Sequence, residues 1–289
     1  MLVLLDFVSL SRPKHWIKNV FILMPVPFAV ASGAAVAPIV FGLGVLAFCL
    51  ANSSVYALND AMDAARDRLH ETKRRRPVAA GRISRTGAFL FSGALAASAL
   101  GLFVVLGQVG GLWIALTYMV VNVVYSLGAK DVPLVDVFLL SSGFLLRVLL
   151  GCALLGVAAS NWLLLCSYAL ALFLSLGKRR GDVVRGLDGQ HRPSLSGYNL
   201  AYLDNAIGVM AATTLMAYAL YLLDAAPMAP GREFLSLPFV VFGVLEYLRI
   251  VQTRAEGGNP VDLLLSSPTI IVCGFGWLAA TLWSLRWDL

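Results

Sequence analysis

The chain contains nine apolar segments of about the length that a helix needs to cross a lipid bilayer. They lie near residues 17–34, 37–58, 86–107, 110–128, 132–155, 161–177, 201–223, 233–252 and 266–285. Hydrophobic residues make up 59% of the 289 positions and charged residues 13%, and the mean hydropathy is +0.82. Because soluble domains carry about 25% charged residues, these values exclude the soluble classes. The sequence therefore predicts an all-α integral membrane protein of about nine transmembrane helices, forming a single domain over residues 1–289.

The Lys and Arg residues are distributed unevenly between the two sides of the predicted membrane protein. Of the 22 Lys and Arg, 19 fall at the amino terminus or in the connections on the same side, whereas Arg232 and Arg286 fall opposite and Arg147 lies within a span. Cytoplasmic loops are enriched in Lys and Arg, so we expect the amino terminus to be cytoplasmic, together with two cap loops near 59–85 and 178–200. The same bias explains the net charge of +6 without nucleic-acid binding.

An acidic motif stands at the cytoplasmic end of the second apolar segment. Its carboxylates, Asp60, Asp63 and Asp67, have helical i, i+3, i+7 spacing and project from one helix face. Carboxylates this close repel one another unless a cation holds them, and hard oxygen ligands select Mg²⁺, which often bridges to substrate phosphates. The alternative is a solvated charged loop. It does not explain why polar residues extend the same stripe into the apolar segment, as Asn52, Tyr56 and Asn59 do. We therefore expect the stripe to line a central cavity that opens to the cytoplasmic side.

Basic residues surround the acidic motif in the sequence and recur in the later cap loop. The first group includes Arg74 and Arg76, and the second begins with Lys178, Arg179 and Arg180 and also holds Asp182, Asp188, His191 and Tyr198. Lys14 and Lys18 share a helical face near the amino terminus, where phosphate binding and plain membrane anchoring are equally good explanations. A topology signal explains a run of basic residues, but not the additional Asp, His and Tyr. His70 and His191 are further candidates for orienting phosphate.

Two neighbouring spans carry polar residues that an apolar environment disfavours. Tyr118, Asn122 and Tyr125 share one face of the fourth span, which ends near Lys130, and Asp136 opens the fifth span. Within the fifth span, Arg147 would cost about 2.5–3.5 kcal/mol at the bilayer centre. We expect Arg147 to point into a hydrated or paired site. A structural ion pair with Asp136 or Glu246 is the alternative.

These motifs together resemble the UbiA-type prenyltransferase superfamily, a group of intramembrane, all-helical, magnesium-dependent enzymes. Its first signature, NDxxDxxxD, is matched by Asn59, Asp60, Asp63 and Asp67. Further segments look like the branch that makes decaprenyl-phosphate phosphoribose: RPKHWIKN at 12–19, DRLHETKRRRPVAAGRIS at 67–84, GFLLR at 143–147, GKRRGD at 177–182, and the pattern formed by Tyr125, Ser126, Lys130 and Asp136. The resemblance covers most of residues 12–200.

The resemblance implies a bacterial inner-membrane enzyme that transfers 5-phosphoribose from phosphoribosyl pyrophosphate to a polyprenyl (decaprenyl) phosphate and releases pyrophosphate. The product would enter cell-wall or envelope glycan synthesis. It also implies site roles. Asp60, Asp63 and Asp67 would hold Mg²⁺, Asn59 would orient the metal shell, and Lys130 and Asp136 would lie across the cavity. The donor's 5-phosphate would be held by Lys178, Arg179, Arg180 and Tyr198, with further substrate contacts from Lys14, Lys18, Tyr56, Arg74, Arg76, Tyr125 and Arg147.

One departure from the superfamily pattern bears on the substrate. Ordinary members carry a second aspartate-rich motif between the sixth and seventh spans, whereas here that loop is basic, and Asp182 and Asp188 do not repeat the DxxxD spacing. One acidic motif suits one magnesium-bound pyrophosphate, and a basic loop supplies charge for further phosphates.

Two other functions remain open, as does homo-oligomerisation. The first is prenyl transfer from a prenyl diphosphate to an aromatic or other acceptor, which the missing second motif disfavours. The second is a lipid transporter or flippase. The connections on the opposite side are nearly uncharged apart from Asp224, Arg232 and Glu233, whereas a permeation path needs polar groups on both sides.

Overall fold

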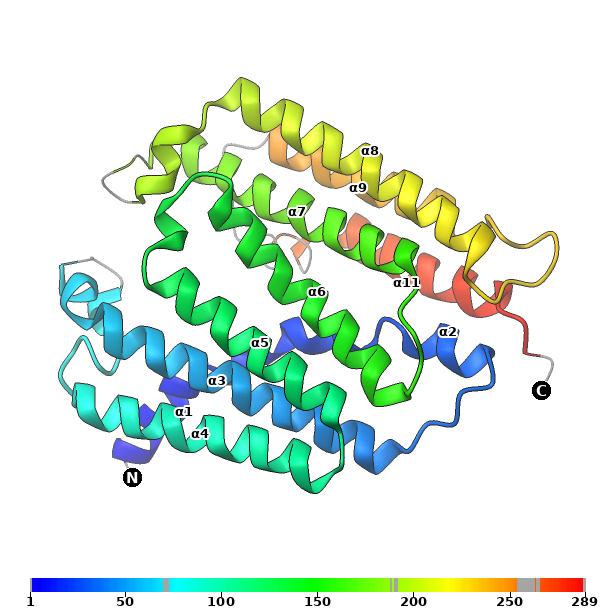
Figure 1. Ribbon diagram of the computed structural model, residues 1–289. Helices are drawn as coiled ribbons and strands as arrows, with labels where there is room; N and C mark the ends of the chain where they lie inside the picture. Colours follow the sequence, from blue (N-terminus) through cyan, green and yellow to red (C-terminus); the bar gives the residue numbers. More distant parts are fainter. Residues whose placement is uncertain are drawn as a thin grey trace. The chain divides into compact units, whose positions relative to one another are not determined.

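The computed structural model describes residues 2–69, 73–187, 189, 192–253, 263 and 266–287. The described chain is helical throughout (Figure 1). In chain order its elements are α1 Leu2–Ser11, η1 Pro13–Leu23, α2 Val26–Ala31, α3 Pro38–Arg68, η2 Lys73–Arg75, α4 Arg85–Val105, α5 Val109–Ser126, η3 Ala129–Asp131, α6 Val135–Leu155, α7 Asn161–Val184, η4 Pro193–Gly197, α8 Leu200–Asp224, α9 Leu237–Thr253 and α11 Pro268–Ser284.

The all-α membrane fold is confirmed, but the helix count differs from nine. Among the described residues, six helices are long and apolar enough to cross a membrane: α3, α4, α5, α6, α7 and α8. Two further expected spans, α9 and α11, are 17 residues long. The first expected span, 17–34, is not one helix, because 3₁₀ helix η1 ends before Pro25 and the short α2 follows it. A proline lacks the amide hydrogen that would continue the helix.

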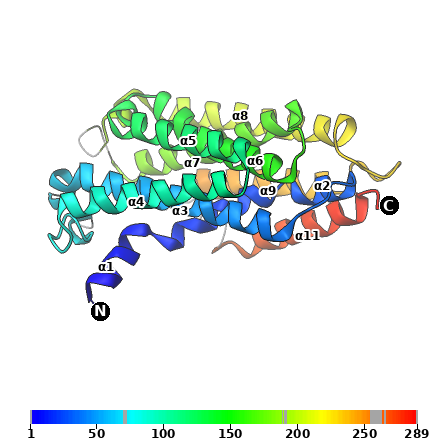
Figure 2. The ribbon, with the colours of Figure 1, turned by 60° about the horizontal axis from the view of Figure 1, so that its bottom comes forward.

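The chain divides into two compact units. Unit 1 comprises residues 1–24, 36–127 and 149–156, and unit 2 comprises residues 25–35, 128–148 and 157–289. In unit 1, helices α3, α4 and α5 pack side by side (Figures 1 and 2). Small residues permit this close packing, since Ala47, Ala51, Ala57, Ala61 and Ala64 on α3 are buried. Unit 1 therefore rests on α3, the helix that carries the acidic motif.

The 3₁₀ helix η1 lies against α3. In a 3₁₀ helix every third side chain points to the same side. Trp16, Asn19 and Ile22 form its inner face, and Asn19 and Ile22 are buried. Trp16 donates a hydrogen bond to the Ser53 hydroxyl at 3.0 Å, and Asn19 Nδ2 lies 3.0 Å from Cys49 Sγ. The residue numbers of these contacts rise along η1 and fall along α3, so the two elements are antiparallel. These polar contacts fix the position of η1 along the helix that ends in the acidic motif.

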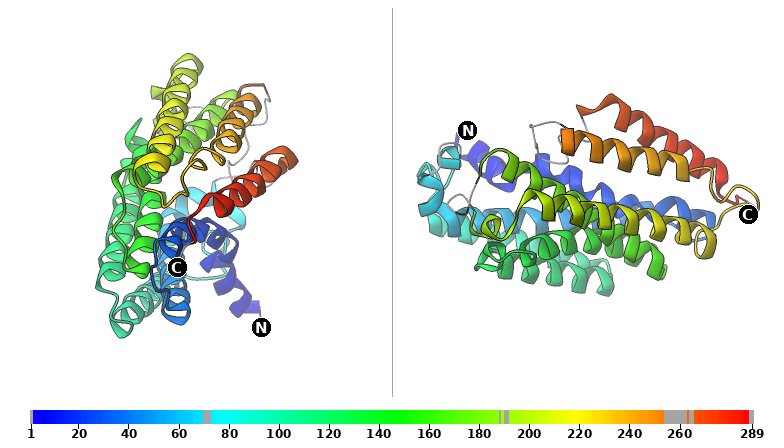
Figure 3. Two further views of the ribbon diagram at one scale, coloured as in Figure 1. Left: turned by 90° about the vertical axis from the view of Figure 1, so that its right-hand side faces the viewer. Right: turned by 90° about the horizontal axis from the view of Figure 1, so that it is seen from above.

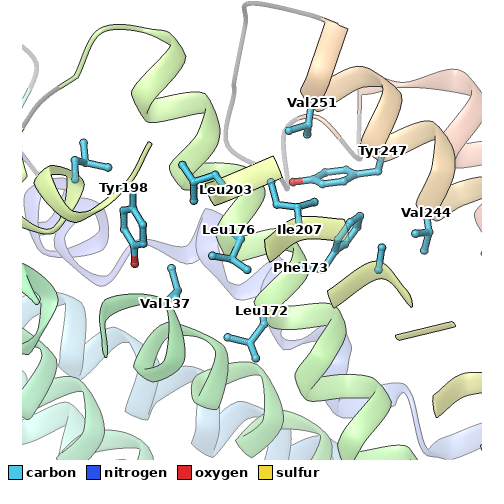
Figure 4. Close-up of a cluster of buried hydrophobic side chains, with 12 residues drawn as sticks. Val137, Leu172, Phe173, Leu176, Tyr198, Leu203, Ile207, Val244, Tyr247 and Val251 are labelled. Atoms are coloured by element: carbon cyan, nitrogen blue, oxygen red, sulfur yellow. The ribbon is translucent and has the colours of Figure 1, made fainter. Parts of the chain in front are cut away.

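Unit 2 is built around α7, α8 and α9, and its core contains Phe173, Leu176, Leu203, Ile207 and Tyr247 (Figure 4). Glycine permits one of these contacts, because a Cβ at Gly177 would lie 2.6 Å from the Tyr247 hydroxyl oxygen. Helices α9 and α11 lie side by side (Figure 3). The core therefore anchors the carboxyl end of α7, where the second basic group begins.

Candidate functional site

In unit 1, the acidic motif lies on the last two turns of α3, and arginines from outside the helix neutralise it. Asp60 and Asp67 are 2% and 3% exposed. The Arg12 guanidinium lies 2.5 Å from Asp60 Oδ1. Arg76 Nη1 lies 3.3 Å from the same Asp60 oxygen and 2.6 Å from Asp67 Oδ2. Asp63 is half-buried on the same helix. The structure thus brings together three of the predicted site residues, Asp60, Asp67 and Arg76.

Arg12 is a site residue that the sequence prediction did not include. Its backbone is left-handed, with φ 50° and ψ 58°, a conformation that non-glycine residues rarely adopt. This turn separates α1 from η1 and directs the side chain over the Tyr56 ring, 5.0 Å from its centroid, as well as to Asp60. The signal was present in the sequence, since Arg12 begins RPKHWIKN, but spacing alone cannot show that it reaches α3.

The other predicted residues of unit 1 take different positions. Tyr56, Lys18 and Tyr125 are half-buried, whereas Lys14 and Arg74 are exposed. Asn59 is also half-buried, and its side-chain oxygen accepts a hydrogen bond from Ser126, the last residue of α5. Asn59 therefore connects α3 to α5.

The carboxylates of unit 1 have the chemistry of a divalent-cation site. No group of three or more His, Cys, Asp or Glu side chains is arranged to hold a metal among the residues that the structure describes. Asp60 and Asp67 nevertheless contact a single nitrogen of Arg76, so their oxygens are close enough to share one cation. Carboxylate oxygens are the ligands that Mg²⁺ prefers, and Mg²⁺ completes its shell with water and substrate phosphates. These residues fit such an ion if Arg76 gives way to it.

In unit 2, the fully buried Asp136 is the centre of a polar network. Its side chain is 0% exposed. Arg179 Nε donates to it at 2.7 Å, Arg192 Nη2 at 3.2 Å, the Ser194 hydroxyl at 3.1 Å and the Tyr198 hydroxyl at 2.8 Å. These donors come from α7 and from the segment around η4. Asp136 therefore holds that segment against the start of α6.

Two of the predicted donor-binding arginines, Arg179 and Arg180, bind partners within unit 2. Arg179 is 1% exposed and also bonds Asp182 at 3.0 Å. Of the three guanidinium nitrogens of Arg179, Nη2 is the one that is buried without a hydrogen-bond partner among the described residues. Arg180 bonds Asp204 Oδ1 at 2.5 Å and the carbonyl of Val251 at 2.6 Å, joining α7 to α8 and α9. Neighbouring residues on a helix point to different sides, so Arg179 and Arg180 bind different partners although they are adjacent in the sequence.

Among the described residues, this network contains more cations than carboxylates. We call it the basic cluster: Lys178, Arg179, Arg185 and Arg192 with Asp136, Asp182, Ser194 and Tyr198. Four cations stand against two carboxylates, and Lys178 is half-buried. Arg192 Nη2 also lies 3.5 Å from the carbonyl of Lys130, which places half-buried Lys130 beside the cluster. The arrangement is suited to binding an additional anion.

Tyr198 ties this cluster to the backbone before α6. Its hydroxyl donates to Asp136 and accepts a hydrogen bond from the Leu134 amide at 2.6 Å. Burial, together with the bond to the Asp136 carboxylate, raises the pKa of the Tyr198 phenol. The phenol therefore stays neutral and remains a hydrogen-bond donor. Leu134 has φ 64°, a conformation that is an outlier for a residue as bulky as leucine.

Within the part of the chain that the structure describes, Arg147 contacts two residues of its own helix, α6. It is 4% exposed, its Nη1 donates to the Gly143 carbonyl at 2.6 Å, and its guanidinium lies 5.6 Å from the centroid of the Phe144 ring. The expected partners are engaged elsewhere: Asp136 by Arg179, and Glu246 by Arg249 at 2.7 Å. His70, Asp188 and His191 lie outside the described residues.

Gly197 allows the η4 segment to approach the chain before α6, and this predicts a measurable defect. A Cβ at Gly197 would lie 2.4 Å from Cγ of Pro133, and the rigid proline ring cannot move aside. We expect Gly197→Ala to destabilise the protein by about 1–3 kcal/mol in thermal unfolding of the purified protein. Gly208→Ala on α8 is the matched control, since its Cβ would meet nothing within 4 Å. Equal unfolding temperatures for the two variants would contradict this contact.

Comparison with known proteins agrees with this geometry. The model of the UbiA prenyltransferase family matches residues 19–259. A curated protein of Corynebacterium glutamicum, decaprenyl-phosphate phosphoribosyltransferase, is 32% identical over 92% of this chain and 82% of its own length. The protein of the same name from Mycolicibacterium smegmatis is 35% identical over 92% of this chain and 88% of its own.

Solved structures show the same fold. A UbiA homologue from Archaeoglobus fulgidus bound to DMAPP and Mg²⁺ has a TM-score of 0.73 and 20% identity, and the match covers 98% of this chain and 100% of that one. The same homologue bound to GPP and Mg²⁺ has a TM-score of 0.72, with 96% of both chains covered. The family match spans most of the chain and includes both the acidic motif and the basic cluster. This chain therefore belongs to the UbiA prenyltransferase family.

Proposed function

We propose that the protein transfers 5-phosphoribose from phosphoribosyl pyrophosphate to a polyprenyl phosphate, with decaprenyl phosphate as the expected acceptor, and releases pyrophosphate. The observation that carries the proposal is the difference between the units. Unit 1 has an acidic motif, whereas Asp182 in unit 2 is engaged by Arg179 and Arg185 within the basic cluster. Ordinary family members use a second acidic metal site for a prenyl diphosphate donor. The pairing of Asp182 with two arginines disfavours such a site here. The curated relatives are named decaprenyl-phosphate phosphoribosyltransferases, which supports decaprenyl phosphate as the acceptor of a phosphoribosyl group.

In this mechanism the protein positions two anionic substrates and neutralises their charge. Asp60, Asp63 and Asp67 would hold Mg²⁺, which when bound stabilises negative charge on the pyrophosphate. Arg12 and Arg76 release the carboxylates and turn to the donor's phosphates. Asn59 orients the end of α3 through Ser126.

The bond changes need no general base from the protein. A lipid phosphate oxygen forms a bond to the anomeric carbon, and the bond from that carbon to the pyrophosphate oxygen breaks with its electron pair. The attacking oxygen is already anionic at neutral pH, so no proton has to be removed. Lys178 and Lys130 would bind phosphate groups, while Asp136, Arg179, Arg180 and Tyr198 act as positioning residues. We propose residues 1–289 as a single catalytic domain.

We also infer an orientation with the amino terminus and the site on the cytoplasmic side of a bacterial inner membrane. Most Lys and Arg residues lie at the amino terminus and in the connections after α3, α5, α7 and α9. Phosphoribosyl pyrophosphate is a highly charged anion that does not cross a bilayer unaided, so the site must face the side on which this donor is made. The product lipid would then supply an envelope glycan.

The defining experiment incubates the purified protein with Mg²⁺, ribose-labelled phosphoribosyl pyrophosphate and decaprenyl phosphate. We expect the label to enter the organic phase with release of one pyrophosphate per lipid. Omission of the lipid is the control. If label enters no lipid, and a prenyl diphosphate instead loses pyrophosphate to an aromatic acceptor, the protein is an ordinary prenyltransferase of its family.

A second prediction concerns the donor. Lys178→Ala should raise the KM for phosphoribosyl pyrophosphate about ten- to 150-fold, since a charge-assisted contact to phosphate contributes about 1.5–3 kcal/mol. The KM for the lipid should change much less. The control is Lys73→Ala, an exposed lysine in unit 1. A donor analogue without the 5-phosphate should be handled almost equally by Lys178→Ala and the unmodified protein. If Lys178→Ala keeps full discrimination between the two donors, the 5-phosphate is held elsewhere.

A further inference from the structure

Unit 2 contains an apolar groove next to the basic cluster. It has a volume of about 340 Å³ and lies among α6, α7 and α8. Its walls include Val137 and Phe138, Leu172 and Leu176, and Ala206 and Val209. Val137, Leu172 and Leu176 are seen together in Figure 4. Phe138 and Val209 are about half exposed, so the groove opens at the surface of helices that are long and apolar enough to span a membrane.

We propose that this groove binds the isoprene units next to the phosphate of the polyprenyl phosphate acceptor. The inference rests on the proposed function and adds the location of its lipid. Its volume lies in the lower part of the range of small-molecule pockets, about 300–1,000 Å³, which is enough for a few isoprene units and not for a whole chain. The remainder of the lipid would stay in the bilayer.

The polar end of the groove is suited to an anionic headgroup. Leu134 is part of its wall, and the amide of this residue bonds Tyr198 of the basic cluster. The groove also reaches the first turn of α6, at Val137, and the first two turns of α8, at Tyr202 and Asn205. Helix amino termini carry partial positive charge. The groove is therefore apolar along its length and electropositive at one end, which matches a lipid phosphate.

The backbone of Leu134 supports a binding role. Its φ of 64° is unfavourable for leucine, and the Tyr198 hydroxyl bond to its amide helps to hold it there. The basic cluster thus determines the position of a groove wall. A chain bound in the groove would have its phosphate beside the cluster that binds the second substrate.

Photolabelling tests the groove directly in the full-length protein. The probe is a polyprenyl phosphate with a diazirine in the isoprene unit next to the phosphate. We expect labelled peptides from residues 134–138 and 202–210, with labelling lost on addition of unmodified decaprenyl phosphate but not of an equal amount of phospholipid. Equal competition by phospholipid would show an annular lipid site, and labelling confined to other helices would also overturn the proposal.

Kinetics provide a matched pair of variants. Ala206→Trp fills the groove, whereas Ala212→Trp makes the same change at an exposed position of α8. We expect Ala206→Trp to raise the KM for decaprenyl phosphate roughly tenfold or more and to leave the KM for phosphoribosyl pyrophosphate unchanged, with neither altered by Ala212→Trp. If the KM for the lipid is the same in both variants, the groove does not bind it.

The two proposals can fail separately. Labelling needs no turnover, so specific labelling without phosphoribosyl transfer would support the groove and refute the proposed reaction. Transfer to the lipid without labelling of the groove would support the proposed reaction and refute the groove as the lipid site.

Discussion

Replacing Asp60, Asp63 or Asp67 individually with Asn should reduce turnover by at least about 10²–10³-fold. The loss of one charged ligand that acts on the leaving group costs several kcal/mol in the transition state, and each 1.36 kcal/mol is about tenfold in rate. The variants should stay folded. Arg12 and Arg76, the partners of Asp60, have side chains that are 20% and 29% exposed, so water can replace the lost charge.

The measurement is turnover at saturating Mg²⁺ and both substrates, with thermal unfolding to check the fold. Asp6→Asn is the control, because Asp6 pairs with the half-exposed Arg82 in the same unit. If all three variants turn over at the normal rate, the acidic motif does not hold a catalytic metal.

Asp136→Asn should have the largest effect on stability, a loss of about 3–5 kcal/mol. Asp136 is 0% and Arg179 1% exposed, and removing one member of a buried ion pair leaves an uncompensated charge without water to solvate it. The same carboxylate also accepts from Arg192, Ser194 and Tyr198, so the η4 segment should loosen as well. Proteolysis near residues 192–198 and the thermal midpoint in detergent would record both effects.

Glu246→Gln serves as the comparison. Glu246 is 11% exposed, but its partner Arg249 is 57% exposed, so water can solvate the guanidinium that loses its partner and the loss should be about 0–1 kcal/mol. Combining Asp136→Asn with Arg179→Met should cost less than the sum of the single changes, since the buried charge is removed as well. Unfolding of Asp136→Asn at the same temperature as Glu246→Gln would show that the network is not a stabilising centre.

The sequence was sufficient for the fold class and for the helix that carries the acidic motif. Long apolar segments have few alternatives to membrane helices, and helical spacing places Asp60 and Asp67 on one face. It failed at the first apolar segment. Side chains return to the buried face every three residues in a 3₁₀ helix and every 3.6 residues in an α-helix. A short apolar run with prolines is too brief to distinguish these two spacings.

Individual roles in the basic run were harder to predict, because they depend on partners distant in sequence. Arg179 meets Asp136 across 43 positions and Arg180 meets the carbonyl of Val251 across 71. A run of basic residues predicts positive charge, but burial decides which guanidinium remains for a ligand. Arg12 was missed for the same reason, since its contact with Asp60 spans 48 positions.

The 3₁₀ geometry of η1 also fixes its length. A 3₁₀ helix rises about 2.0 Å per residue and turns about 120°, against about 1.5 Å and 100° in an α-helix. The 11 residues of η1 therefore reach about 22 Å, roughly 5 Å farther than the same residues in an α-helix. A deleted residue would shift Arg12 by about 2 Å and rotate it by a third of a turn relative to Asn19. Substitutions on its outer face, at Ile17 and Val20, leave that reach unchanged, so this segment should vary in sequence more readily than in length.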